Sequence, residues 1–279
     1  MKKKVSSILL TLIFMAGLAI MAYPKVSDYW NSFHASQAIV SYTEAVSGLS
    51  EEEYEELYRA AEAYNSGLLE RQNPFLLTEE EKSVYPELLN LGGDGIMGYI
   101  EIPMIGVELP IYHGTSENVL QVGIGHLDWT SLPVGGESTH AVLSGHRGLP
   151  SAELFSSLDR LVAGDRFVLN VLNEILTYEV DQILIVLPED VGALQIAEGE
   201  DQCTLVTCTP YGVNTHRILV RGHRVETEHT VRVTAEALQV EPLLVAAALA
   251  IPLLLVMFML MMSGDQRQWD DRQDYRDEI

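Results

Sequence analysis

The sequence predicts a mainly β domain, a closed or nearly closed barrel, with helices before it and an apolar segment near each end of the chain. From Gly92 onward the chain consists of short β-branched runs separated by Gly and Pro. Helix-capping signals precede this region, and two uncharged runs of bilayer-spanning length bracket the whole. Seven or eight short strands with few helices favour closure, because closure removes exposed strand edges.

Helices are predicted within residues 24–90, which we interpret as an N-terminal elaboration packed on the barrel. Ser50 and Glu53 have the spacing of a capping box, and the helix that they begin has one apolar face and ends near Gly67. A weaker apolar stripe predicts a preceding helix over residues 28–46.

Strands are predicted within a main domain of residues 91–232. Their expected positions are Gly98–Ile102, Val107–Tyr112, His140–Ser144, Arg166–Leu172, Leu176–Val186, Thr204–Cys208 and Arg217–Val220. The Gly-x-Gly within residues 122–125 lacks the strand-to-helix setting of a nucleotide-binding loop, and we expect no cofactor.

The two apolar runs predict a membrane topology. Val5–Tyr23 and Leu243–Met262 carry no charge and are long enough to be transmembrane helices. The lysines within residues 1–4 place that end in the cytoplasm, so the middle is extracytoplasmic and the tail, residues 263–279, is cytoplasmic. A cleaved signal peptide is the alternative for the first run, because Ala22 offers a small residue at a possible cleavage site.

The charge of the chain excludes one class of function. The formal net charge is -23, and residues 24–241 hold 11 Lys and Arg against 34 Asp and Glu. Nucleic-acid binding without sequence preference needs clustered Lys and Arg, which this composition lacks. We expect a soluble, acidic and self-repelling extracytoplasmic domain.

Two cysteines, Cys203 and Cys208, lie on one predicted strand. Five positions apart, they face opposite sides of the sheet and are separated by roughly 16 Å, whereas a disulfide needs Cα atoms within about 7 Å. Both are therefore expected to be unpaired. Cys203 is expected to pack as a small apolar residue, whereas Cys208 ends the strand, where it can be exposed.

Cys208 is the candidate nucleophile of a cysteine-dependent enzyme. A turn follows it, and the next β-like run opens with Arg217, which predicts an antiparallel pair with the two residues side by side. A thiol becomes a useful nucleophile at neutral pH when a positive charge lies nearby. Arg217 is always charged, and it can bind an oxyanion or the substrate backbone, or else pair with an acid.

Eight histidines compete to be the proton donor. His146 is the best candidate, because it follows a buried strand and is flanked by glycines in a loop of the kind that lines clefts. His126 is a competitor, whereas His216 is expected to face away from the site and His223 to have a packing role in the barrel. His126 and Asp128 are too few to bind a metal ion, so no metal site is expected.

The segment Thr204-Leu-Val-Thr-Cys208 followed by Arg217 resembles the TLxTC…R signature of sortases, the Gram-positive cell-surface transpeptidases. The segment Leu143-Ser-Gly-His-Arg-Gly-Leu-Pro and the sequence after Cys208 are similar to the class C, pilin-polymerising branch. The resemblance extends over residues 91–224, and the two apolar segments also suit that class.

The resemblance implies an eight-stranded sortase barrel and a transpeptidase reaction. Cys208 would attack the Thr–Gly bond of an LPXTG-like sorting signal, His146 would protonate the leaving amine, and Arg217 would support the oxyanion. The thioacyl intermediate would then pass to an amine, for class C typically a lysine of a pilin subunit. The implied partners are pilin or surface proteins that carry such sorting signals.

The tripeptide Asn73-Pro74-Phe75 resembles the Asp-Pro-aromatic lid that class C members often carry upstream of the barrel. Phe75 would cover Cys208, and Pro74 would stiffen the loop. Asn73 departs from the pattern, because an amide cannot form a charged pair with Arg217, and such a lid would open more easily. A simple Asn-Pro turn between helix and barrel is the alternative.

Two other functions stay open at this point. A housekeeping sortase would use the same chemistry to attach surface proteins or pili to peptidoglycan, with lipid II as the amine acceptor. A non-catalytic, membrane-anchored binding module would retain only the barrel, and the complete set of Cys208, His146 and Arg217 argues against it.

Overall fold

The computed structural model describes residues 2–71 and 73–227, with all of their side chains except those of residues 2–10 and 12. Within this part, the chain begins with three helices and continues into eight strands. The helices are α1 (Lys2–Ser47), α2 (Glu51–Leu68), α3 (Glu79–Val84) and the short α4 (Glu117–Leu120), which lies between the second and third strands.

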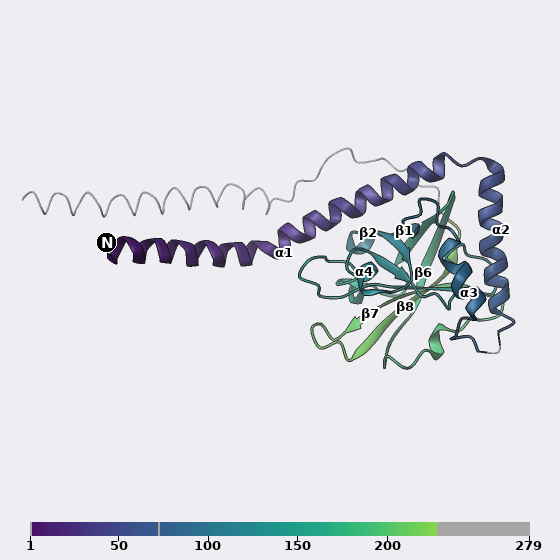
Figure 1. Ribbon diagram of the computed structural model, residues 1–279. Coiled ribbons are helices and arrows are strands. Elements are labelled where there is room, and N and C mark those ends of the chain that lie inside the picture. The colour runs from purple at the N-terminus through teal and green to yellow at the C-terminus, as the bar shows by residue number, and fades with distance from the viewer. Residues whose placement is uncertain (1, 72, 228–279) are drawn as a thin grey trace, which may run out of the picture. The chain divides into compact units, whose positions relative to one another are not determined.

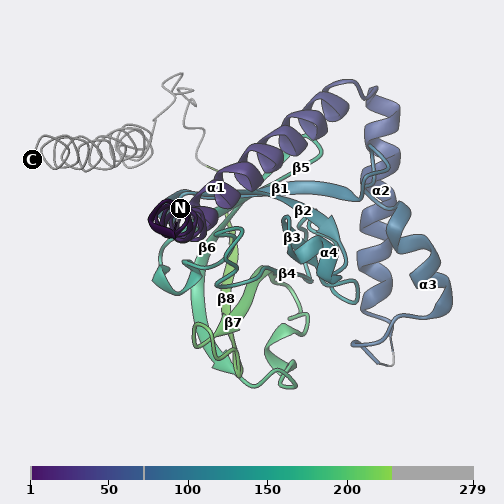
Figure 2. The ribbon, with the colours of Figure 1, turned by 60° about the vertical axis from the view of Figure 1, so that its left-hand side comes forward.

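The strands close into a barrel in the order β1-β2-β3-β4-β7-β8-β6-β5. Figures 1 and 2 show this barrel with α1 and α2 outside it. The strands are β1 (Ile96–Ile102), β2 (Val107–His113), β3 (Ile124–His126), β4 (Thr139–Ser144), β5 (Arg166–Val171), β6 (Glu174–Val186), β7 (Asp201–Thr209) and β8 (His216–Val225). The predicted closed barrel is therefore confirmed.

β3 is a strand that the sequence analysis did not predict. It pairs in parallel with β2 and antiparallel with β4. A Cβ on Gly125 in this strand would lie 2.3 Å from the carbonyl oxygen of Gly114, so only glycine permits the close approach. A three-residue strand centred on glycine has no apolar alternation by which it can be recognised.

The interior of the barrel is filled by side chains. Tyr178 and Phe167 are fully buried there, and their rings stack with centroids 5.5 Å apart. Cys203 and Leu205 of β7 belong to the same core. Because side chains alternate along a strand, Thr204, Val206 and Cys208 of β7 face outward. Chemistry on this barrel must therefore take place on its outer surface.

α2 begins as the sequence predicts. The Ser50 hydroxyl accepts a hydrogen bond from the N–H of Glu53 at 3.3 Å, and the Glu53 carboxylate accepts one from the N–H of Ser50 at 2.9 Å. Further along the helix, the buried amide of Asn65 exchanges two hydrogen bonds with the backbone of Leu132. These bonds fix α2 against the barrel.

α1 is longer than the helix predicted over residues 28–46, because it continues without a break through Pro24 to Lys2. Its C-terminal half packs on the barrel, where the Tyr42 hydroxyl donates to the carbonyl of Met97 at 3.1 Å. Within the described residues, no helix is both long enough and apolar enough to cross a membrane. The second predicted transmembrane segment, residues 243–262, lies outside the described residues.

Candidate active site

Cys208 and Arg217 form a cross-strand pair. β7 and β8 run antiparallel, and their register places Cys208 directly opposite Arg217. The predicted juxtaposition is confirmed. Opposed residues of an antiparallel pair have Cβ atoms about 4.5–5.5 Å apart, so the guanidinium lies within reach of groups bound at the thiol.

The pair lies on the outer face of the barrel. Val206 shares the face of Cys208 on β7, and Leu219 shares the face of Arg217 on β8. Both belong to an apolar cluster that is separate from the barrel core and also includes Val142 of β4. A buried apolar cluster thus extends across three neighbouring strands on the face that carries Cys208.

His146 reaches the site through the parallel pairing of β4 and β7. The pairing continues past the end of β4, because the N–H of Gly145 donates to the carbonyl of Val206 at 3.0 Å and its carbonyl accepts from Thr207 Oγ1 at 2.7 Å. The next position is His146 on one segment and Cys208 on the other. The loop that carries His146 therefore leaves β4 beside β7, whereas Arg217 lies opposite Cys208 on the β8 side.

The imidazole of His146 keeps one nitrogen uncommitted. Within the part of the chain that the structure describes, Nε2 is buried and has no hydrogen-bond partner. It lies 3.7 Å from Oε2 of Glu117 at the start of α4, too far for a hydrogen bond but close enough to attract a protonated ring. A ring nitrogen without a fixed partner is suited to giving and taking a proton.

Arg217 is oriented by backbone groups. Its Nη1 donates to the carbonyls of Asn214 at 3.2 Å and His216 at 3.0 Å. Because both acceptors are uncharged, these bonds orient the guanidinium without cancelling its charge. The arginine can thus stabilise negative charge that develops beside Cys208.

His126, the main competitor of His146, is a structural residue. It is fully buried, with Nδ1 2.9 Å from the Tyr85 hydroxyl and Nε2 2.8 Å from the carbonyl of Ser131. Burial lowers the pKa of His126 to about 4. His140 is also buried, which lowers its pKa, and its ring contacts Gln195 and Thr204. Both rings are neutral at pH 7.

Two further competitors, His216 and His223, lie on β8. His216 pairs with Thr209 and has its Nδ1 2.9 Å from the Thr215 hydroxyl. Strand alternation puts it on the face opposite that of Arg217, as predicted. His223 is half-buried and lies six residues beyond Arg217, so it is remote from the thiol along the strand.

Both cysteines are unpaired, as predicted. Cys203 is fully buried in the barrel core, and this burial raises the pKa of its thiol well above the ordinary value. Cys203 therefore stays a neutral thiol. Cys208 is half-buried at the end of β7, where a substrate can reach it.

The predicted lid tripeptide contacts this buried apolar cluster through Trp129. The rings of Phe75 and Trp129 meet edge to face with centroids 5.4 Å apart, and Trp129 in turn packs on the cluster that contains Val206. Asn73 Oδ1 accepts the N–H of Phe75 at 3.1 Å, so the amide shapes its own loop, in which Pro74 is exposed. That Phe75 covers Cys208 itself stays a prediction.

A nearly buried arginine anchors the base of this loop. The Arg71 side chain is 7% exposed, and its Nε donates to Oε1 of Glu81 at 2.7 Å. Its Nη1 donates to the carbonyl of Trp129 at 3.3 Å. Arg71 thus joins the two ends of this loop and also bonds to Trp129, the residue that Phe75 contacts.

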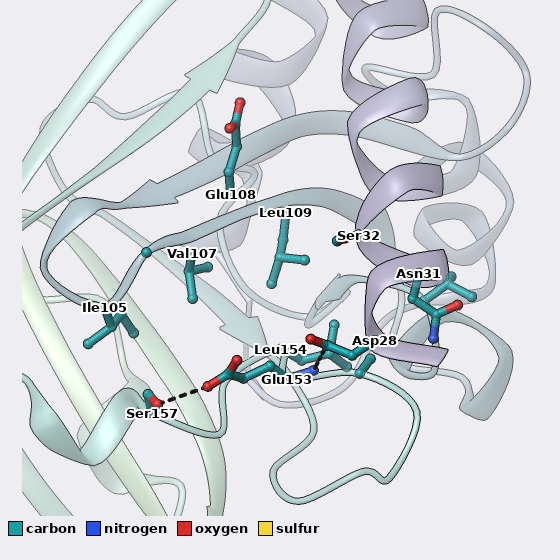
Figure 3. Close-up of a pocket in the computed structure, with 13 residues that line it drawn as sticks. Asp28, Asn31, Ser32, Ile105, Val107, Glu108, Leu109, Glu153, Leu154 and Ser157 are labelled. Carbon is teal, nitrogen blue, oxygen red and sulfur yellow. Dashed lines mark hydrogen bonds between the residues drawn. The ribbon is translucent and has the colours of Figure 1, made fainter. Parts of the chain in front are cut away.

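A pocket of about 170 Å³ lies between α1, β2 and the segment that follows His146 (Figure 3). Two hydrogen bonds join its walls. Asp28 Oδ1 accepts the N–H of Glu153 at 2.8 Å, and Asn31 Nδ2 donates to the carbonyl of Ser151 at 2.8 Å. α1 therefore holds the loop that carries His146.

Sequence reasoning missed two charged residues of the site, Glu117 and Arg147. Glu117 belongs to a four-residue helix that no sequence pattern predicts. The partners of Arg147, Thr209 and Asp159, are distant in sequence, so they can be identified only once the strands are paired. Within the part of the chain that the structure describes, no group of three or more His, Cys, Asp or Glu is placed to hold a metal ion.

Comparison with known proteins finds similarity to one family. The family model for the sortase domain matches residues 100–225. Sortase C1 from Streptococcus agalactiae is 52% identical, with a TM-score of 0.67, over 69% of this chain and 100% of its own. Sortase C from Streptococcus pneumoniae is 46% identical, with a TM-score of 0.63, over 70% and 100%. For sortase C from Clostridium perfringens the values are 43%, 0.61, 69% and 100%.

The fold and these similarities define a cysteine transpeptidase built on a closed β-barrel. The chain belongs to the sortase family, and to the class C branch of that family.

Proposed function

We propose that this chain is a membrane-anchored, pilin-type sortase with Cys208 as nucleophile, His146 as proton donor and acceptor, and Arg217 as oxyanion support. It cleaves an LPXTG-like sorting signal between Thr and Gly and joins the new Thr carboxyl end to a lysine amine of a pilin subunit. The observation that supports this proposal is that Cys208 lies opposite Arg217 of β8, while β7 pairs on its other side with β4, which ends two residues before His146.

The reaction follows from that placement. Cys208 Sγ attacks the Thr carbonyl carbon, and the oxyanion that forms lies beside the Arg217 guanidinium. The C–N bond breaks as His146 protonates the Gly amine, which leaves a thioester on Cys208. An incoming lysine amine then attacks the thioester carbonyl and loses a proton to His146, and the sulfur departs as a new amide bond forms.

Three further observations support the pilin role. The structure of the Streptococcus pneumoniae enzyme is described as giving insights into catalysis and pilin substrate specificity, and that of the Clostridium perfringens enzyme was solved with the C-terminal cell wall sorting motif. Phe75 contacts Trp129, which packs on the buried apolar cluster that contains Val206. The uncharged runs at residues 5–23 and 243–262 are long enough to anchor both ends of the chain, with the barrel outside the cell.

The test is to trap and then resolve the acyl enzyme. The full-length chain in detergent is incubated with an LPXTG peptide, and mass spectrometry locates the adduct; a lysine-bearing pilin fragment is then added. We expect a thioacyl adduct on Cys208 that the lysine resolves. Cys208→Ala should give no adduct, whereas Cys203→Ala, its matched control on the same strand, should behave as wild type.

Each alternative function predicts a different result. No adduct in the wild-type chain would favour a non-catalytic binding module. An adduct resolved by a glycine-type or lipid II amine, and never by the pilin lysine, would favour a housekeeping sortase.

A further inference from the structure

The residue after His146 is an arginine tied to the strand of the nucleophile. Arg147 Nη1 donates to Thr209 Oγ1 at 3.2 Å, and Nη2 donates to the carboxylate of Asp159. The Arg147 side chain is 10% exposed, so these partners hold its charge largely out of water. Thr209 directly follows Cys208 and is itself buried.

These contacts continue the pairing of β4 with β7 past the end of β4. Each residue of β4 lies opposite the residue 62 positions later in β7. Gly145 and Thr207, which share a hydrogen bond, are also 62 positions apart, and so are Arg147 and Thr209. His146 and Cys208 are the one pair enclosed between these two ties.

The rest of the loop is anchored separately. The N–H of Phe155, whose ring is fully buried, donates to the carbonyl of His146 at 3.2 Å. The N–H of Gly148 donates to the Ser156 hydroxyl at 2.9 Å. These bonds close the loop on itself but do not reach β7. Beyond the end of the strand pairing, Arg147 donates a hydrogen bond to the strand of the nucleophile.

We propose that Arg147 is a positioning residue, which through its bond to Thr209 holds His146 opposite Cys208. This inference rests on the proposed function for the roles of His146 and Cys208. Arg147 and Arg217 then have separate tasks on the two sides of β7. Arg217 supports charge on the substrate, whereas Arg147 fixes the distance over which the proton moves. A planar guanidinium can reach two acceptors at once, which a lysine ammonium on a flexible stem does poorly.

Substitution of Thr209 tests this without touching a charged group. Valine keeps the shape of threonine but cannot accept the bond from Arg147, whereas serine keeps the hydroxyl. With the full-length chain and an LPXTG peptide, we expect Thr209→Val to lower kcat roughly tenfold and to leave KM within about a factor of two, because a displaced proton donor slows the chemical step. Thr209→Ser should restore kcat to near the wild-type value.

The alternative outcomes are distinct. An unchanged kcat in Thr209→Val, or a serine variant no better than the valine one, overturns the proposal. A fall in kcat that only follows a fall in the folded fraction, measured by thermal unfolding, also overturns it. If Thr209→Val does not fold, Asp159→Ala, which removes the other acceptor of Arg147 at its half-exposed end, should also lower kcat.

Failure of the proposed function would look different. In that case the wild-type chain itself forms no thioacyl adduct, whatever the variants do. The rate at which iodoacetamide alkylates Cys208 can be measured without a peptide substrate. It reports on the position of His146, because a nearby imidazole raises the reactivity of the thiol. We expect this rate to fall in Thr209→Val and to recover in Thr209→Ser; equal rates in all three chains would overturn the positioning role.

Discussion

Cys203 and Cys208 belong to the same strand but have different surroundings. The first lies in the apolar core, where burial raises the pKa of its thiol and keeps it neutral. The second lies on the outer face at the end of β7, with Arg217 opposite. Strand alternation alone separates the two, because an odd spacing places residues on opposite faces.

A thiol titration checks this separation. In the native chain we expect Ellman's reagent to react with one thiol, because it reaches Cys208 but not Cys203. Unfolding in guanidinium should expose the second. Cys208→Ala should show no reactive thiol until it unfolds, and Cys203→Ala should show one in both states. Two reactive thiols in the native chain would contradict the structure.

The site residues differ in how far the sequence could predict them. Cys208 and Arg217 are joined by a short turn, so local pairing was enough to place them side by side. His146 was favoured over His126 by its flanking glycines, and the burial of His126 argues against His126 as the proton donor. The roles of Arg147 and Glu117 depend on strands and helices distant in sequence, which residue types alone do not bring together.

At the scale of elements, the lid is the segment whose effect is most direct to measure. Phe75→Ala removes the ring contact with Trp129, so we expect iodoacetamide to alkylate Cys208 roughly 2–10 times faster, since an aromatic pair is worth about 0.5–1.5 kcal/mol. Leu76→Ala is the matched control, because Leu76 is the next residue and is exposed. Equal alkylation rates for Phe75→Ala and wild type would favour the simple Asn-Pro turn.

The bond between α1 and the His146 loop gives a second prediction. Asp28→Ala removes the acceptor of the Glu153 N–H, so we expect faster hydrogen exchange at that amide and a stability loss of about 1 kcal/mol. Asp28→Asn keeps an acceptor oxygen and should stay close to wild type. Unchanged exchange at Glu153 in the alanine variant would show that α1 does not hold this loop.

The elements also show where sequence patterns end. The barrel strands with clear alternation were predicted within a few residues, and the capping box gave the start of α2. β3 was missed because its glycine serves a close backbone approach. The predicted apolar segment 5–23 and helix 28–46 proved to be parts of α1, because the pattern changes at Pro24 while the backbone stays helical.

At the scale of the whole molecule, buried histidines link stability to pH. The pKa of His126 is about 4 in the folded chain, against an ordinary value of 6.5. Between these values the unfolded chain binds more protons, so stability is full above pH 6.5 and falls as the pH is lowered toward 4. For His126 alone the full loss is about 3 kcal/mol. His140, whose pKa is also lowered, acts in the same direction.

Urea unfolding at pH 7 and pH 5 measures this loss. His126→Gln should be less stable than wild type at pH 7 but should lose less between the two pH values. His34→Gln changes an exposed histidine of α1 and should show the wild-type loss. If His126→Gln does not fold, NMR of the wild-type chain is the check: the His126 ring should stay neutral at pH 5, and protonation there would contradict the prediction.

The strand order of the barrel also sets the time at which the enzyme can first act. β7 lies between β4 and β8, although it follows β4 in the chain only after β5 and β6. During synthesis, the β7 residues that pair with β4 are made 62 residues after their partners. Arg217 is made later still. A nascent chain that has not yet reached β8 therefore lacks the arginine that lies opposite Cys208 in the finished barrel.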